Sequence, residues 1–201
     1  MKIGVLGGTF DPIHLGHIMI AEEARQSLSL EKVILIPAGR PIFKTHRRLT
    51  PPEHRLKMVK LAAARQKYMT VYDMEIRRRG PSYTVDTLAE LREQKGQQDE
   101  IYFIIGWDNL AELPKWREPE RIIEMCRLAA VPRPGVPKPD LEELENRVPG
   151  IKRRTVLLEK PWTDISATDI RQRVAGGKSI DGMVPAPVAE YIKKHGLYLK
   201  S

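Results

Sequence analysis

The chain has 201 residues, of which 41% are hydrophobic and 30% are charged, and its formal net charge is +8 at pH 7. This length and composition predict a globular protein with its own core, organised as a single domain over residues 1–201. An apolar run of roughly 18 residues is lacking, which excludes a membrane-spanning helix, and the N-terminal segment lacks the features of a secretory signal, so a cytoplasmic location is expected.

The positive charge is concentrated in one part of the sequence. Residues 40–79 carry twelve Lys/Arg and three Asp/Glu, whereas the rest of the chain is close to neutral. Such a regional surplus suits an anionic ligand, or a polyanion docked on one side of the molecule. Solvated helix faces explain it equally well, because basic residues are common on surface helices.

Strand-like and helix-like segments alternate through the first half of the chain. An apolar run predicts a strand at 2–8, and apolar residues at helical spacing predict a helix over 15–28. A second strand is expected at 31–39, followed by a loop and then a helix over 50–66, whose prolines suit a first helical turn. The pattern over 69–78 predicts a third strand.

The second half continues this alternation. A helix is predicted over 82–96 by Ser/Thr at its start and Gly at its end, and strands are predicted at 99–106, 126–135 and 153–160. Cys126 lies in an apolar setting, which indicates a buried, unreactive thiol. The sequence therefore predicts an α/β fold, a Rossmann-like, doubly wound and mostly parallel sheet, with a small C-terminal helical portion at about 162–201.

Residues 7–17, GGTFDPIHLGH, combine two glycines with two histidines where the first strand gives way to the first helix. Gly7 and Gly8 allow backbone N–H groups to approach an anion, and the helix N-terminus adds further donors. His14 and His17 share one face of the first turn and can donate hydrogen bonds to phosphate oxygens. A structural role and zinc binding are the alternatives, and zinc is disfavoured because no further Cys or His lies at ligand spacing. The stretch predicts a phosphate site.

Two separated motifs carry a family resemblance. GTFDPIHLGH (8–17) and ISATDIR (165–171) resemble the first and last signatures of the nucleotidyltransferase superfamily of adenylyltransferases. PSYTVDTL, FIIGWDNLAELPKW and VPAPVAEYIKKHGLY further resemble bacterial nicotinate-mononucleotide adenylyltransferases. The resemblance implies an enzyme of NAD biosynthesis that joins ATP and nicotinate mononucleotide into deamido-NAD and pyrophosphate by direct in-line attack. Mg²⁺ is then expected to arrive with ATP, without a metal site in the protein.

By motif match, the resemblance also assigns roles to individual residues. His17 would stabilise the transition state, Arg171 would clamp the leaving pyrophosphate, and Lys44 would reach the phosphates of both substrates. The implied catalytic residues are His14, His17, Lys44 and Arg171. The implied ATP-binding residues are Gly7, Gly8, Thr9, Phe10, His14, His17, Gly106, Asp108, Arg133, Ile165, Ser166, Thr168 and Arg171. The implied mononucleotide-binding residues are Lys44, Ser82, Tyr83, Thr84, Trp107, Asp108, Leu113, Trp116 and Arg117.

Several of these roles have a structural alternative. Thr84 offers a donor to the nicotinate carboxylate at a helix start, and Trp116 offers a flat face to the pyridine ring, unless it packs in the core. Asp108 lies near the ribose hydroxyls or caps a helix, and Arg133 resembles an arginine near the adenine. For Asp11 a turn-stabilising role and a catalytic role are both open.

Three positions depart from the family pattern, namely Phe43, Trp107 and Ala167. Nicotinamide mononucleotide and phosphopantetheine are the alternative substrates, and discrimination between the acid and the amide is expected to depend on backbone donors. The remote alternative is a basic nucleic-acid-binding protein, for which the sequence lacks the known binding motifs. The expected partners are therefore ATP and nicotinate mononucleotide, without stable nucleic-acid or membrane binding, and the sequence predicts no oligomeric state.

Overall fold

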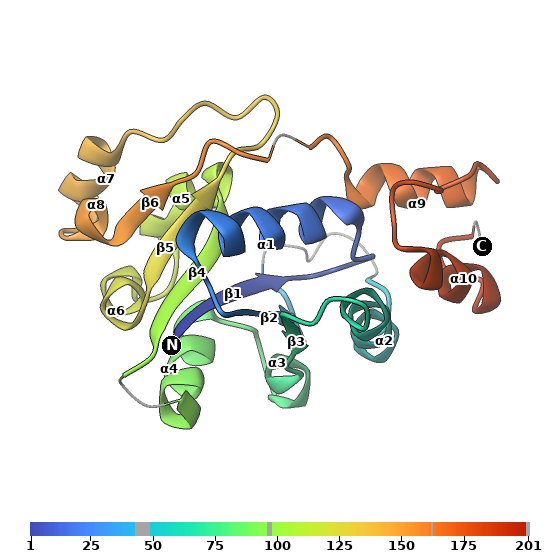
Figure 1. Cartoon of the computed structure of the whole chain (residues 1–201), viewed down its shortest axis with the longest axis horizontal. Helices are drawn as coiled ribbons and strands as arrows, with labels where there is room; N and C mark the ends of the chain where they lie inside the picture. Colours follow the sequence, from blue (N-terminus) through green and yellow to red (C-terminus); the bar gives the residue numbers. More distant parts are fainter. Residues whose placement is uncertain (43–48, 96–97, 162, 200–201) are drawn as a thin grey trace.

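The computed structural model describes residues 1–42, 49–95, 98–161 and 163–199. They form a six-stranded sheet with helices packed around it (Figure 1). The strand order is β3-β2-β1-β4-β5-β6, and each neighbouring pair is parallel. This confirms the predicted Rossmann-like, doubly wound α/β fold. The strands are β1 (Lys2–Gly8), β2 (Lys32–Pro37), β3 (Met69–Val71), β4 (Glu100–Gly106), β5 (Arg127–Val131) and β6 (Thr155–Leu157).

Helices cover both faces of the sheet, and Figure 1 shows α1 and α4 on opposite sides of it. One layer consists of α1 (Leu15–Leu28), α2 (Pro52–Ala63), α9 (Ala167–Ala175) and α10 (Ala186–Lys194). The other consists of α3 (Met74–Arg77), α4 (Thr84–Lys95), α5 (Trp107–Glu112), α6 (Pro119–Met125), α7 (Leu141–Arg147) and α8 (Ile151–Arg154), with a 3₁₀ turn over Leu113–Lys115. None of the described helices is long and apolar enough to cross a membrane.

The alternation of side chains along each strand produces two hydrophobic cores. In β2, Val33 and Leu35 pack in the core beneath α1 and α2, whereas Ile34 and Ile36 pack in the core beneath α4. All four are at most 1% exposed. A strand buried on both faces is typical of a parallel sheet, and it explains why these strands are continuous apolar runs in the sequence.

The prediction of a single strand over 69–78 was wrong in its second half. The strand ends at Val71, and α3 begins directly after Asp73. Asp73 forms an ion pair with Arg77 at 2.9 Å, and this i,i+4 spacing is typical of a helix. The apolar residues of this stretch therefore serve a short edge strand and then a single helical turn.

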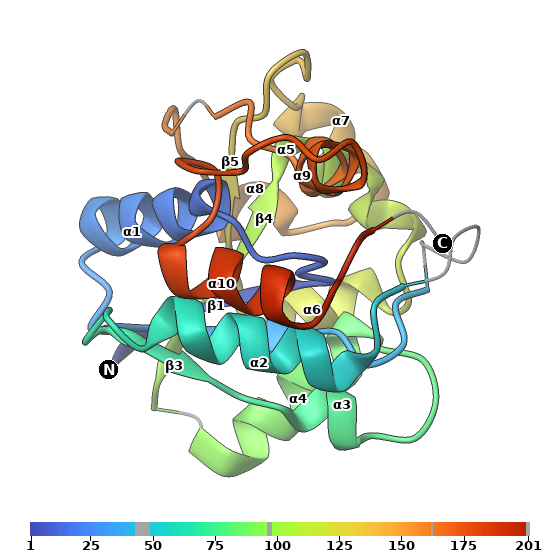
Figure 2. The same cartoon turned by 90° about the vertical axis from the view of Figure 1, so that its right-hand side faces the viewer.

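The C-terminal helices lie at the end of the sheet where the parallel strands finish. Leu15 N, at the start of α1, donates to Met183 O at 2.8 Å, so the segment between α9 and α10 contacts the first motif. Figure 2 shows α10 alongside α2, where Tyr191 OH and His54 Nδ1 are 2.8 Å apart. This packing brings the C-terminal part of the chain to the ends of β1 and β2.

Candidate functional site

The strand order reverses between β1 and β4, and the crevice outside their carboxyl ends is the expected ligand position in this fold. Phe10 follows β1 with φ +47°, and its ring turns back over Gly8. A Cβ on Gly8 would lie 3.0 Å from that ring, so this glycine has a packing reason as well as the predicted role in anion approach. At Gly7 a Cβ would meet Phe103 at an ordinary 3.6 Å.

The two motif histidines form one stacked unit at the start of α1. His14 is the N-cap residue, and its backbone N donates to His17 Nδ1 at 3.2 Å. Their ring centroids are 3.7 Å apart, and the Phe10 ring meets His17 edge-on at 5.0 Å. Because Nδ1 of His17 accepts a hydrogen bond, the neutral ring carries its proton on Nε2. His17 therefore offers an N–H donor whose orientation is set by a helix cap.

The second motif is brought against the first through Arg171. Its Nη1 donates to Asp11 O at 2.7 Å, and its Nη2 donates to Thr168 Oγ1 at 3.0 Å. Ser166 caps α9 by accepting from Asp169 N at 3.1 Å. The start of α9, the start of α1 and the loop after β1 therefore meet at one place.

Ile165 precedes α9 and is partly buried against the core that α1 and α2 share. A Cβ on Gly16 would lie 3.3 Å from Thr163 Cγ2, which shows how closely this segment approaches the first turn of α1. The predicted phosphate-binding residues of the described chain thus lie on two facing segments.

A second group of predicted residues lies at the ends of β4 and β5. Gly106 is the N-cap of α5, and Asp108 Oδ2 accepts from Arg133 Nη1 at 2.7 Å. A Cβ on Gly106 would clash with Asp108 Oδ1, so a larger residue at this position would displace that carboxylate. That carboxylate oxygen is buried and has no hydrogen-bond partner among the described residues, which leaves it able to accept from a hydroxyl group. Asp108 is not the N-cap residue of α5, so the capping alternative does not apply.

The predicted mononucleotide residues divide into a surface group and a core group. The Arg117 guanidinium lies 4.8 Å from the centre of the Tyr83 ring, and the half-buried Trp116 meets Phe103 edge-on at 6.4 Å. These contacts place the start of α4, where Thr84 is the first residue, beside the segment after the 3₁₀ turn.

Other members of that set are tied into the fold itself. Ser82 Oγ accepts from Gly39 N at 3.1 Å and from Arg40 N at 3.3 Å, which links the approach to α4 with the loop after β2. Trp107 is buried and Leu113 is 0% exposed, so the side chains of both belong to the core. Lys44 and Phe43 lie outside the described residues.

Arg55 is a structural feature of this region that the sequence pattern did not indicate. The helix α2 buries Arg55, Met58, Val59, Ala62 and Ala63. Arg55 is only 1% exposed and donates to Thr9 O at 2.8 Å, Ala38 O at 2.6 Å, Gly39 O at 3.1 Å and Thr50 O at 2.9 Å. The helical spacing of Arg55 from Val59 and Ala62 could have indicated that it is buried, but an arginine is usually expected to be exposed.

Glu75 forms a second buried polar centre, beneath the predicted mononucleotide residues. It accepts from Thr87 Oγ1 at 2.7 Å, and Arg78 Nη1 donates to the same threonine hydroxyl at 3.1 Å. Burial raises the pKa of the Glu75 carboxyl group. This centre joins α3 to α4 at the end of the sheet that carries the site.

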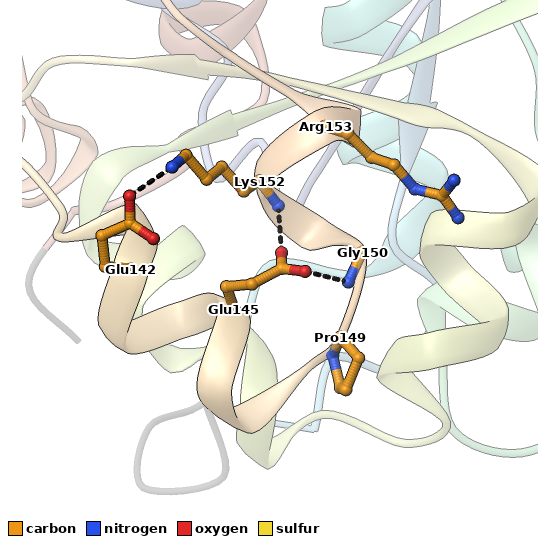
Figure 3. Close-up of a pocket in the computed structure, with 6 residues that line it drawn as sticks. All are labelled: Glu142, Glu145, Pro149, Gly150, Lys152 and Arg153. Atoms are coloured by element: carbon orange, nitrogen blue, oxygen red, sulfur yellow. Dashed lines mark hydrogen bonds and ion pairs between the residues drawn. The ribbon is translucent and has the colours of Figure 1, made fainter.

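A surface hollow between α7 and α8 lies apart from these motifs (Figure 3). Glu145 accepts there from Gly150 N at 2.7 Å and from Lys152 N at 2.8 Å, and Lys152 also pairs with Glu142. Its polar groups bind one another, and it includes none of the predicted site residues. Across the ranges that the structure describes, no group of three or more His, Cys, Asp or Glu is arranged to hold a metal ion.

Comparisons with known proteins agree with this geometry. Residues 5–173 match the cytidylyltransferase-like family. A probable nicotinate-nucleotide adenylyltransferase of Dehalococcoides mccartyi strain BAV1 is 48% identical over 200 residues, covering 100% of this chain and 98% of the relative. One of Roseiflexus sp. strain RS-1 is 48% identical over 196 residues, covering 98% and 97%.

A solved structure shares the fold. The Plasmodium falciparum nicotinic acid mononucleotide adenylyltransferase complexed with NaAD has a TM-score of 0.79 and 20% identity, covering 98% of this chain and 97% of that one. Fold, motif geometry and full-length similarity lead to the same result, and the chain belongs to the nicotinate-nucleotide adenylyltransferases of the cytidylyltransferase-like family.

Proposed function

We propose that this protein transfers the adenylyl group of ATP to nicotinate mononucleotide, giving deamido-NAD and pyrophosphate in NAD biosynthesis. The observation that carries the proposal is the contact between Arg171 and Asp11, which brings the two nucleotidyltransferase motifs together at the proposed anion-binding site. The names of the full-length relatives support the choice of substrates.

The proposed chemistry needs alignment and charge neutralisation rather than a protein nucleophile. A 5′-phosphate oxygen of the mononucleotide attacks the α-phosphorus of ATP, and the bond from that phosphorus to the oxygen bridging to the β-phosphate breaks as pyrophosphate leaves. His17 supplies a neutral Nε2–H donor to the charge that develops on the transferring phosphate, beside His14. Arg171, fixed through Asp11 and Thr168, binds the leaving pyrophosphate.

Nucleotidyltransferases generally use a divalent metal with ATP, and we propose that Mg²⁺ enters as part of the ATP complex. Magnesium usually binds substrate phosphates and keeps several water ligands, so it needs few protein ligands. The imidazole and guanidinium groups at the proposed phosphate site suit a substrate that brings its own cation. The metal would neutralise charge on the leaving pyrophosphate.

The remaining predicted residues are proposed to hold the two nucleosides. Gly106, Asp108 and Arg133 would bind the ATP nucleoside, since the buried Asp108 Oδ1 can accept from a ribose hydroxyl. Tyr83, Thr84, Trp116 and Arg117 would form the nicotinate pocket, with Lys44 reaching the phosphates. A single-domain organisation is part of the proposal, supported by two helical layers that pack on one sheet.

The test is a steady-state assay of pyrophosphate release from MgATP and nicotinate mononucleotide, with deamido-NAD identified by chromatography. Nicotinamide mononucleotide and phosphopantetheine are compared by kcat/KM, and the acid is expected to be preferred by at least about 10-fold. Preference for another acceptor would replace the proposed substrate. Absence of turnover with every acceptor, together with salt-sensitive RNA binding, would overturn the proposed function.

A matched pair of arginines on α9 tests the proposed site. Arg171→Ala is expected to lower kcat/KM by about 100-fold or more, because a charged donor to the leaving pyrophosphate is lost. Arg173→Ala is the control, since Arg173 pairs at 3.0 Å with the partly exposed Asp169 on the same helix. Equal effects of the two substitutions would remove Arg171 from the site.

A further inference from the structure

Tyr198, in the segment that follows α10, reaches back into the predicted phosphate site. Its hydroxyl donates to Asp11 Oδ1 at 2.8 Å, although the two residues are 187 positions apart. Gly196 and Tyr198 have φ values of +58° and +65°, which turn the chain back after the helix. Leu197 N donates to Ile192 O at 3.0 Å and fixes this turn to α10.

Asp11 connects this C-terminal segment to both motifs. The residue is 2% exposed, its carboxylate accepts from Tyr198, and its main-chain carbonyl accepts from Arg171 at 2.7 Å. It also lies three positions before His14, the N-cap residue of α1. Any shift of Asp11 therefore moves the histidine turn and the arginine relative to each other.

Thr50 lies beside the Tyr198 hydroxyl and links the C-terminal segment to the end of β2. Its main-chain carbonyl accepts from the buried Arg55 at 2.9 Å. Arg55 in turn donates to Thr9 O at 2.8 Å, two residues before Asp11. Burial raises the pKa of Tyr198, so the hydroxyl keeps its proton and remains a donor through the neutral range.

We propose that Tyr198 is a positioning residue for adenylyl transfer, whose hydroxyl holds Asp11 and thereby fixes the His14–His17 turn against Arg171. This inference rests on the proposed function, in which those residues bind the ATP phosphates. In-line transfer depends on the alignment of reacting groups, so a small displacement of the turn lowers the rate. Tyr198 itself acts only through Asp11.

The test compares Tyr198→Phe with Tyr191→Phe. Each substitution removes one hydroxyl that forms a hydrogen bond in the C-terminal part of the chain, but Tyr191 bonds to His54 and not to the site. Tyr198→Phe is expected to lower kcat/KM for MgATP by about 10-fold, the size expected from one hydrogen bond to a charged group. The KM for the mononucleotide should stay within about twofold, because that substrate is held elsewhere.

Tyr191→Phe should lower the melting temperature about as much as Tyr198→Phe does, but it should leave kcat/KM for MgATP unchanged. Equal kinetic effects of the two substitutions would overturn the proposal, because they would indicate loss of stability alone. A double-mutant cycle adds the route of action, since Tyr198→Phe should have less than about a twofold effect in an Asp11→Ala background. Additive effects would also overturn it.

Two further measurements keep this test independent of its assumptions. If the wild-type protein releases no pyrophosphate, the proposed function fails, but calorimetric titration with MgATP still tests positioning, with a Kd about 10-fold higher for Tyr198→Phe than for Tyr191→Phe. Equal Kd values would overturn the inference. If Tyr198→Phe does not fold, Asp11→Asn and Asp11→Ala are compared instead. Asp11→Asn keeps an acceptor for the Tyr198 hydroxyl, so it should retain about 10-fold more activity than Asp11→Ala. Equal activities would overturn the inference.

Discussion

Substitution of His17 tests the phosphate site most directly, because the two ring nitrogens have separate tasks. Nδ1 accepts from His14 N at 3.2 Å and caps α1, whereas Nε2–H is the proposed donor to the transferring phosphate. In His17→Asn the side-chain oxygen can take the place of Nδ1. In His17→Gln the amide nitrogen can take the place of Nε2–H, and His17→Ala removes both groups.

The expected magnitudes follow from these tasks. Loss of one transition-state donor lowers kcat by about 100- to 1,000-fold, so Asn and Ala should be similarly inactive. Gln should retain a donor and lie between them and the wild type. Loss of the cap costs about 1 kcal/mol, which corresponds to a fall in melting temperature of about 2–4 °C for a chain of this size. Ala and Gln should therefore melt below Asn.

The assay is pyrophosphate release at saturating MgATP and mononucleotide, paired with thermal unfolding of each variant. The order expected in kcat is wild type, Gln, then Asn and Ala together. The order expected in melting temperature places Asn above Ala. A His17→Asn enzyme with wild-type kcat would show that the Nε2 donor has no part in transfer, and this reading of the histidine pair would be wrong.

Three further predictions concern buried groups. Burial raises the pKa of the Cys126 thiol to about 12, which leaves roughly one thiolate in 10,000 molecules at pH 8, so a thiol reagent should label the protein only after unfolding. In Gly39→Ala the new Cβ clashes with the backbone carbonyl of Glu75. Calorimetry should therefore show about 2 kcal/mol lower stability, and the KM for the mononucleotide should rise. Unchanged values would show that the loop adjusts to the new side chain without cost. Because burial raises the pKa of Glu75, the stability that its protonated form contributes is present at acid pH and is lost as the pH rises, so Glu75→Gln should gain melting temperature over wild type as the pH is raised toward neutral. A difference independent of pH would contradict that shift.

The sequence predicted the elements whose patterns are long enough to read. β1, β2 and β4 are apolar runs buried on both faces, and the 14-residue helix α1 has its apolar residues at helical spacing. The helices from α5 to α8 have at most 7 residues each, so a helical period completes about two turns at most and cannot be separated from loop. Residues 69–78 failed for the same reason, because three strand residues and a four-residue helix were merged.

The candidate site could be predicted only as far as its residues lie in motifs. The histidine pair was predicted from a local pattern and Arg171 from the family resemblance of a distant motif, and parallel-sheet topology explains why such segments meet. Asp11 and Tyr198 were not connected, since a hydrogen bond between residues 187 positions apart leaves no periodic signal. For Leu113 the motif gave no sign of burial, and the structure shows that its side chain is fully buried in the core.

The surplus of basic residues over 40–79 supports nucleic-acid binding less well once the surroundings of the individual residues are known. Of the twelve basic residues between 40 and 79, Arg55 is buried against backbone carbonyls, Arg78 pairs with Glu90 and Arg77 pairs with Asp73. Arg55 is therefore not available to a polyanion, and the charges of Arg77 and Arg78 are partly offset by their partners, so the count of charges overstates the case for nucleic-acid binding.

The buried Arg55 also places a positive charge next to the loop after β1, because its guanidinium donates to Thr9 O. A charge kept away from water is screened by salt less than one on the surface. If this cation contributes to ATP binding, affinity for MgATP should fall less steeply with salt than the binding of a nucleic acid by surface lysines and arginines, whose salt dependence grows with every phosphate contacted. The slope of affinity against salt concentration therefore separates the two functions that the net charge alone left open.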